Sequence, residues 1–228
     1  MTPTTLIIPG YHGSEAEHWQ TWMESELPDA RRVIGIDWES PVLGRWAETV
    51  STAITRSTGP VWLVAHSFGC LATVAAANHV ASKVAGAMLV APADPDRFSP
   101  FGIRSPSAPT ESLAPRLPAH PLSFPSLVVA SDNDPWMPTS KLTPWITRWE
   151  SQVIHIGRAG HINVESGFGP WPQGLDLLRR LQQGCYPSSP TPAAPAQWRR
   201  PAPGPADRGY PSGPHHGSAP GARKAPCA

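Results

Sequence analysis

The chain has 228 residues, enough for one domain of ordinary size or one domain with a tail. Its formal net charge of +1 gives no strong attraction to nucleic acid or to an anionic membrane surface. No apolar run approaches the roughly 20 residues of a membrane-spanning helix, and the first residues lack the basic leader of a secretory signal. The three cysteines, Cys70, Cys185 and Cys227, form no disulfide framework. We therefore expect a soluble, cytoplasmic protein.

Residues 1–183 alternate between strand-like and helix-like segments. The apolar patterns predict strands over 5–8, 33–36, 61–65, 84–90, 127–130 and 153–156. They predict helices over about 16–27, 43–56, 69–79, 139–149 and 173–182. Several strands are nearly continuous apolar runs, as expected when helices cover both faces of a sheet. The pattern predicts one α/β domain with a mostly parallel, doubly wound sheet.

Two segments depart from this alternation. Residues 92–126 are rich in Pro and Ser without clear periodicity, and so long a loop inside a domain is usually a lid or a binding loop. Residues 184–228 contain no Leu, Ile, Val, Met or Phe, so we expect a disordered Pro/Gly/Ala-rich tail. A metal role for His215 and His216 in this tail has no further ligand to support it.

The stretch VWLVAHSFGCLATVAAA, residues 61–77, places Ser67 between a buried strand and an alanine-rich helix. Ala65 and Gly69 are small, as a tight strand–turn–helix requires. Ligands of a parallel sheet bind at the carboxyl ends of its strands, and the amide end of the helix favours an anion there. This pattern is a nucleophile elbow with Ala in place of the first Gly. A plain helix cap is the alternative role for Ser67.

A serine hydroxyl needs a base to act as a nucleophile. Of the histidines that follow Ser67, we favour His161, which lies in the loop GRAGHINVESG after the last predicted strand. His79 falls on the helix after the elbow, and His155 lies within a strand pattern. His120 falls in the proline-rich loop.

The acid that orients the base is expected after the strand SLVVA, in the sequence SDNDPWMP. We favour Asp134, which precedes a proline and a loop, over Asp132, which could instead cap the turn. Asp94, which follows an earlier strand, is a further candidate. The acid accepts the imidazole N–H, fixes the tautomer and stabilises the imidazolium.

The backbone N–H of Phe68 is positioned to bind an oxyanion. A second donor is expected from the loop after the first strand, from the amide of Tyr11 or His12. His12 and His18 lack a third ligand at fitting spacing, so we expect no metal. Aromatic residues that could form an acyl pocket, or equally pack in the core, are Trp19, Trp136, Phe168 and Trp171.

Four motifs in this order resemble a known family. PGYHGSEAEHWQTW, AHSFGC, SDNDPWMP and GHINVESGFGPWPQG are together similar to the small serine hydrolases of the YdeN and retinoblastoma-binding protein 9 group, over about residues 4–182. The resemblance implies an α/β-hydrolase fold with a minimal cap and a triad of Ser67, Asp134 and His161. It also places the pair His18–Trp19 near the active site. Members of the group are described as carboxylesterase-like hydrolases.

These observations together predict a serine hydrolase that acts on small carboxylic esters without a metal or organic cofactor. An amide, a thioester or a carbon–carbon bond could be the target of the same residues. A protein-binding module that retains the hydrolase fold is a further alternative, and an intact triad argues against it. We expect a small-molecule ester as the partner, and neither nucleic acid nor a membrane.

Overall fold

The computed structural model describes residues 3–105 and 110–185, so the predicted tail lies almost wholly outside the described residues. Its centre is a six-stranded sheet in the order β2-β1-β3-β4-β7-β8, and every neighbouring pair is parallel. The strands are β1 (Thr4–Ile8), β2 (Ala30–Arg32), β3 (Val61–His66), β4 (Val84–Val90), β7 (Ser126–Ala130) and β8 (Gln152–His155).

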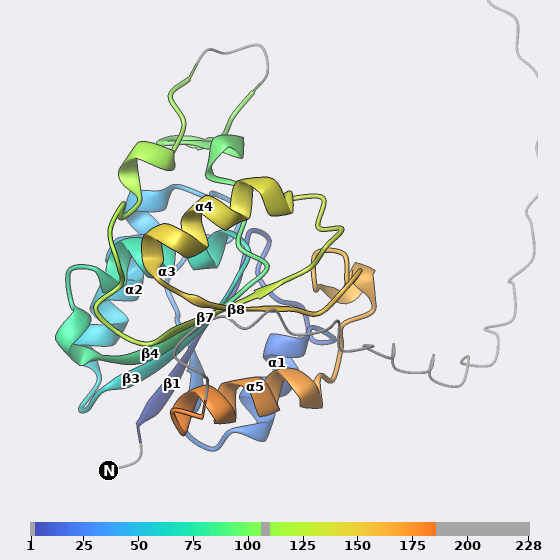
Figure 1. Cartoon of the computed structure of the whole chain (residues 1–228). Helices are drawn as coiled ribbons and strands as arrows, with labels where there is room; N and C mark the ends of the chain where they lie inside the picture. The colour runs from blue at the N-terminus through green and yellow to red at the C-terminus, as the bar shows by residue number, and fades with distance from the viewer. Residues whose placement is uncertain (1–2, 106–109, 186–228) are drawn as a thin grey trace, which may run out of the picture.

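Helices cover both faces of this sheet, which confirms the predicted doubly wound architecture (Figure 1). They are α1 (Trp19–Glu26), α2 (Leu43–Arg56), α3 (Phe68–Ala77), α4 (Thr139–Trp149) and α5 (Pro172–Gln182). Helices α2, α3 and α4 lie on one face, and α1 and α5 lie on the other. Successive strand residues point to opposite faces, so Leu63 packs with the first group and Val64 with the second.

The order of the strands creates a binding crevice. From β1 the chain passes to β2 on one side and then to β3 on the other, so the loops after β1 and β3 leave the sheet in different directions. A crevice outside the carboxyl ends at such a switch point is the usual ligand site of an open α/β sheet. The loop at 9–13 and the turn at Ser67 both begin there.

The predicted strand over 33–36 is wrong, because the edge strand β2 lies three residues earlier. The Val33 amide still donates to the Ile7 carbonyl at 3.0 Å, but Gly35 then adopts a φ of 85° and the chain turns away. Ile34 is 85% exposed. The apolar side chains of Val33 and Ile36 are buried as parts of a loop, which gave them the appearance of a strand.

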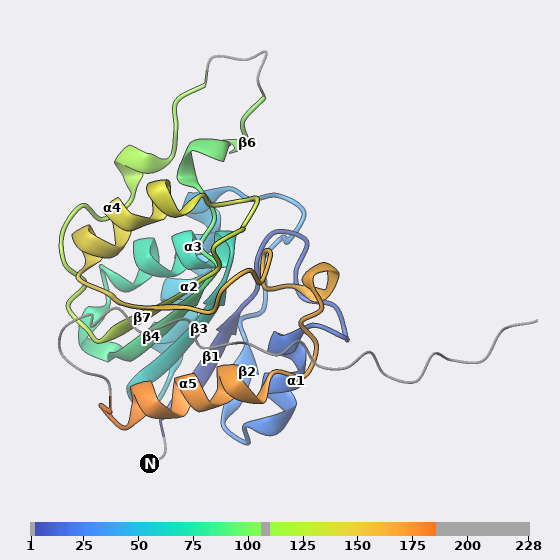
Figure 2. The same cartoon turned by 45° about the vertical axis from the view of Figure 1, so that its right-hand side comes forward.

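The segment between β4 and β7 carries little regular structure. Its described part holds the two-stranded antiparallel sheet of β5 (Phe98–Ser99) and β6 (Gly102–Ile103), which lies near α3 and α4 in Figure 2. Two 3-10 helices, Pro95–Arg97 and Ala114–Arg116, flank this hairpin. Lys141 on α4 binds Asp94 at 2.6 Å and Asp96 at 3.1 Å, which fastens the start of the segment to the domain.

Candidate active site

Ser67 occupies the turn between β3 and α3 in a conformation that few non-glycine residues adopt. Its φ is 54° and its ψ is −124°, and a backbone conformation of this kind costs roughly 1–3 kcal/mol. The Ser67 amide donates to the Val90 carbonyl at 3.1 Å, which holds the turn against β4. Ser67 occupies the N-cap position of α3, but its hydroxyl makes no capping bond to the helix.

Two glycines permit the close approach of the chain segments around this turn. A Cβ added at Gly69 would lie 2.3 Å from the Pro9 carbonyl oxygen, so a side chain there would collide with the backbone after β1. A Cβ at Gly10 would lie 2.8 Å from the Cβ of Ser67. The loop after β1 therefore lies directly against the serine because both positions lack side chains.

A continuous chain of hydrogen bonds joins Ser67 to a carboxylate. The Nδ1 of His161 lies 2.9 Å from each carboxylate oxygen of Asp134, and its Nε2 lies 2.8 Å from the Ser67 Oγ. A carboxylate only accepts hydrogen bonds, so Nδ1 carries the proton and Nε2 accepts from the serine hydroxyl. All three side chains are buried. Such an arrangement can remove a proton from the hydroxyl and stabilise the imidazolium that results.

The rival acids lie elsewhere. Asp132 is half exposed and binds Nδ1 of His155 at 3.0 Å, so these two residues pair with each other. Asp94 is buried, but its carboxylate accepts from Lys141 and from the Asp96 amide. Of the three candidate acids, the structure brings Asp134 to His161.

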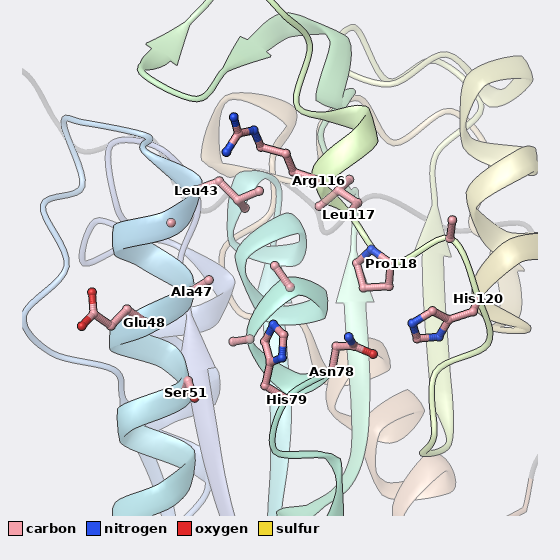
Figure 3. Close-up of a pocket in the computed structure, with 14 residues that line it drawn as sticks. Leu43, Ala47, Glu48, Ser51, Asn78, His79, Arg116, Leu117, Pro118 and His120 are labelled. Atoms are coloured by element: carbon pink, nitrogen blue, oxygen red, sulfur yellow. The ribbon is translucent and has the colours of Figure 1, made fainter.

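The rival bases His79 and His120 line a different cavity, which is shown in Figure 3. This cavity has a volume of about 760 Å³ and lies between α2, the end of α3 and residues 116–120. Ser67 and His161 are not among its lining residues. Neither His79 nor His120 is therefore placed to serve the serine.

The loop that carries His161 is held by donors from distant parts of the chain. His66, the last residue of β3, lies with Nε2 2.9 Å from the His161 carbonyl oxygen. The indole N–H of Trp19 donates to the next carbonyl, that of Ile162, at 2.8 Å. Ile162 has a φ of 51°, a strained value for a β-branched residue. These bonds hold the loop in a conformation that it would not favour alone.

Acceptors hold the amides of the same loop. The Ala159 amide donates to the Ser131 hydroxyl at 3.0 Å, and the Gly160 amide donates to the Asn133 side chain at 2.9 Å. The His161 amide itself donates to the Ser166 hydroxyl at 3.0 Å. The position of the imidazole is therefore fixed through its backbone as well as through Asp134.

Two further histidines next to His161 are held neutral. Burial lowers the pKa of His66 well below its ordinary value, and nearby histidines lower it further. Burial likewise lowers the pKa of His18 from 6.5 to about 4, assisted by the charge of Arg32. Because His66 faces a carbonyl oxygen, its neutral ring carries the proton on Nε2 and donates it.

The loop after β1 distinguishes between the two expected oxyanion donors. The His12 amide donates to the Trp38 carbonyl at 2.9 Å, so it is not available to a ligand. The Tyr11 amide has no hydrogen-bond partner within residues 3–105 or 110–185. Phe68 is the first residue of α3, where the amide has no partner inside the helix. Of the three expected donors, Tyr11 and Phe68 therefore keep a free amide among the described residues.

The cavity above Ser67 has a volume of about 340 Å³. It is lined by Tyr11, His12, Gly13, Glu15, His18, His66, Ser67, Phe98, Trp136, His161, Asn163 and Glu165. Of the four aromatic residues that could form its walls or equally pack in the core, Trp136 lines it and the other three do not. Trp19, Phe168 and Trp171 instead pack together in the core beside α1 and α5, with ring centroids 5.3–5.5 Å apart.

Sequence reasoning missed several lining residues and the role of one short motif. His66 and Phe98 were not singled out, although His66 stands next to Ser67 in the elbow pattern. At the start of α1, Gln20 is fully buried, and its amide nitrogen donates to the Ile8 carbonyl at 3.1 Å and the Val64 carbonyl at 3.2 Å. Gln20 thus joins β1 and β3 beneath the crevice, while Trp19 next to it binds the loop of His161.

The described residues contain neither a metal-ligand cluster nor a membrane-spanning helix. No group of three or more His, Cys, Asp or Glu side chains in residues 3–105 and 110–185 is arranged to hold a metal ion. Over the same residues, no helix is long and apolar enough to cross a membrane. The described cysteines, Cys70 and Cys185, are both free thiols.

The sheet, the helices on both faces and the serine at the turn after β3 define an α/β-hydrolase fold. A YdeN-like hydrolase of Pectobacterium atrosepticum has the same fold, with 36% identity and a TM-score of 0.71 over 82% of this chain and 94% of the other. The ydeN gene product of Bacillus subtilis matches with 22% identity and a TM-score of 0.62, over 80% of this chain and all of the other. Est1E of Butyrivibrio proteoclasticus, solved with ferulic acid bound, shares the fold at 14% identity and a TM-score of 0.57, over 81% and 88% of the two chains.

The model of the serine hydrolase family matches residues 5–180, and the chain belongs to that family. The curated hydrolase YdeN of Bacillus subtilis is 24% identical over 192 residues, which cover 78% of this chain and 95% of the relative. The predicted resemblance to YdeN-like hydrolases is therefore confirmed. The protein is an enzyme, a serine hydrolase.

Proposed function

We propose that the protein is a carboxylesterase in which Ser67 is the nucleophile, His161 the general base and Asp134 the residue that orients it. The observation that carries this proposal is the unbroken chain of hydrogen bonds from the Ser67 hydroxyl through both nitrogens of His161 to Asp134. The strained φ of Ser67 supports it, because a strained residue at a ligand crevice is typical of a functional site.

In the first half of the proposed reaction, His161 Nε2 takes the hydroxyl proton while Ser67 Oγ bonds to the ester carbonyl carbon. The carbonyl oxygen becomes an oxyanion that accepts hydrogen bonds from the Phe68 and Tyr11 amides. As the tetrahedral intermediate collapses, its carbon–oxygen bond to the alcohol breaks. His161 gives its Nε2 proton to the departing alkoxide, which leaves an acyl group on Ser67.

In the second half, water takes the place of the alcohol. His161 removes a proton from the water, and the resulting hydroxide bonds to the acyl carbon to form a second tetrahedral oxyanion. Collapse of this intermediate breaks the bond to Ser67 Oγ, and the Nε2 proton returns to the serine. Asp134 keeps the Nδ1 proton throughout and stabilises each imidazolium as it forms. The proposed reaction needs no metal or organic cofactor.

The cavity supports a small ester as the substrate. Its volume of about 340 Å³ lies near the lower end of the range for small-molecule sites. Phe98 and Trp136 give it two apolar walls. Trp136 also lies 5.9 Å from the His161 ring, between ring centroids, so a substrate at the base contacts an aromatic surface.

A panel of p-nitrophenyl esters of increasing acyl length tests the proposal. We expect turnover of the short esters by the wild-type protein, and a loss of roughly 10⁶ in kcat in Ser67→Ala, the scale seen when such a nucleophile is removed. Thermal unfolding of Ser67→Ala should match the wild type, because the hydroxyl does not cap α3. Full esterase activity in a folded Ser67→Ala protein would overturn the proposal.

A further inference from the structure

The side chain of His18 combines near-complete burial with a place in the wall of the active-site cavity. It is 2% exposed and lines the same cavity as Ser67, His66 and His161. Its ring centroid lies 5.1 Å from that of His66, the residue directly before Ser67. The proposed reaction assigns no part to this histidine.

The hydrogen bonding of His18 fixes where its proton lies. Its Nδ1 accepts from the Gln20 amide at 3.1 Å, which makes His18 the N-cap of α1. A nitrogen that accepts from a backbone amide carries no proton, so the neutral ring bears its only proton on Nε2. Burial and the charge of Arg32 keep the ring neutral by lowering its pKa to about 4. His18 is therefore a fixed hydrogen-bond donor at Nε2.

Within the part of the chain that the structure describes, this donor has no protein partner. No hydrogen bond to another residue in the described ranges uses Nε2 of His18, although the ring is almost completely buried. Nε2 is not among the fully enclosed side-chain atoms that lack a partner, so it is open to the cavity, where an acceptor on a ligand can bind it. Because the ring lines the cavity, the acceptor that fits is an atom of the substrate.

We propose that His18 is a specificity residue whose Nε2–H binds a second, uncharged oxygen of the ester substrate. This inference rests on the proposed esterase function. The acceptor is uncharged because the ring offers no positive charge, and because the carboxylates of Glu15 and Glu165 line the same cavity and repel an anion. The substrate class is thus an ester that carries an ether, hydroxyl or carbonyl oxygen beside the scissile group.

Two substitutions separate this role from the capping of α1. His18→Asn keeps a side-chain acceptor near the position of Nδ1, and Asn is a favoured N-cap residue, but it loses the donor at the Nε2 position. His18→Gln extends its amide to the position of Nε2 and retains a donor there, but it loses the cap. We expect Asn to preserve stability and Gln to preserve specificity.

The test compares kcat/KM for pairs of esters that differ only by oxygen in place of CH₂. One pair varies the acyl group, with p-nitrophenyl methoxyacetate against p-nitrophenyl butyrate. The other varies the alcohol, with 2-methoxyethyl acetate against butyl acetate. The two esters of a pair differ in intrinsic reactivity, but this difference is the same for every variant. It therefore cancels when the ratio of the two kcat/KM values is compared between variants. In at least one pair we expect His18→Asn to lower the oxygen preference by about tenfold and His18→Gln to retain it.

Unchanged ratios for both pairs in a folded His18→Asn protein would overturn the inference, and so would ratios that follow the melting temperature. A second readout does not depend on activity: ¹⁵N NMR of the histidine-labelled protein, assigned with His18→Asn, should show the proton of His18 on Nε2. A proton on Nδ1 would overturn the inference. Failure of the wild-type protein to hydrolyse any ester would instead count against the proposed function itself.

Discussion

The proposed nucleophile, Ser67, and the proposed base, His161, lie in two loops that are held in different ways. Around Ser67 the chain is fixed by backbone packing: Gly69 touches the Pro9 carbonyl, and the Ser67 amide is bound to β4. Around His161 the chain is fixed by side chains, with His66 and Trp19 each holding one carbonyl. A single substitution in the turn at Ser67 should therefore abolish activity. In the loop of His161, each lost anchor should lower activity by only part.

The largest effect is expected at Gly69. In Gly69→Ala the new methyl group collides with the rigid backbone after β1, which we expect to cost more than about 3 kcal/mol of stability and to abolish activity. The matched control is Gly44→Ala on α2, where an added Cβ would meet no atom of the described residues outside its own helix within 4 Å, and where alanine favours the helix. Urea unfolding measures the stability of the two variants, and ester turnover measures their activity. A stable, active Gly69→Ala protein would show that the elbow is not held by this packing.

The second largest effect is expected at Asp134, the acid proposed to orient His161. Asp134→Asn should keep the fold but leave His161 in the wrong tautomer, at a cost on the order of 10⁴ in kcat. Asp132→Asn is the control, because Asp132 pairs with His155 at the surface and should have little effect on kcat. Steady-state kinetics with a p-nitrophenyl ester compares them. The reverse order of effects would assign the acid to Asp132.

A smaller loss is expected when one anchor of the base loop is removed. Trp19→Phe keeps a ring in the core but removes the donor to Ile162, and a displaced base should lower kcat by about 10- to 100-fold. Trp149→Phe is the control, since this buried indole donates to the Pro118 carbonyl at 3.0 Å, away from the site. We expect similar stability losses in both but unchanged kcat in the control. Equal kcat in the two variants would make Trp19 purely structural.

The last prediction concerns the pH dependence of stability and not the activity. The folded-state pKa of His18 is about 4 and that of His66 is also below the ordinary 6.5, so both rings stay neutral while the unfolded chain takes up protons. The free energy of unfolding is therefore not reduced by these two histidines above pH 6.5. It falls as the pH drops from 6.5 toward 4, because only the unfolded chain is protonated there. His18 accounts for about 3 kcal/mol at most of this loss in the free energy of unfolding. Urea unfolding from pH 7 to pH 4.5 should show this decline, and His18→Asn should make it shallower. Equal slopes in the two proteins would contradict the low pKa of His18.

The difference between the two loops also explains what the sequence reveals. Ser67 could be placed because the elbow pattern is local: five residues, a strand before them and a helix after them. The anchors of the base loop could not, because Trp19 acts on a residue 143 positions away and His66 on one 95 positions away. Contacts between residues so far apart in the sequence give no signal in motif spacing or in hydrophobic periodicity.

The same reasoning applies to the fold and to the cavity. The four central strands β1, β3, β4 and β7 are buried and nearly continuous apolar runs, so they were located within a residue or two, as was the edge strand β8. The edge strand β2 ends in Arg31 and Arg32 and was missed, whereas the buried loop that follows it imitated a strand. The sequence left Trp19 and Phe168 equally between pocket and core, because an aromatic residue has the same sequence signal in a core and in a cavity wall.

The most direct test of the central claim is covalent labelling by a fluorophosphonate probe, followed by peptide mapping. If Ser67 is activated by His161 and Asp134, the wild-type protein will take up one label, on Ser67. Ser67→Ala will take up none, and Asp134→Asn will react far more slowly than Asp132→Asn. A wild-type protein that stays unlabelled, or that carries its label on another residue, would contradict the account.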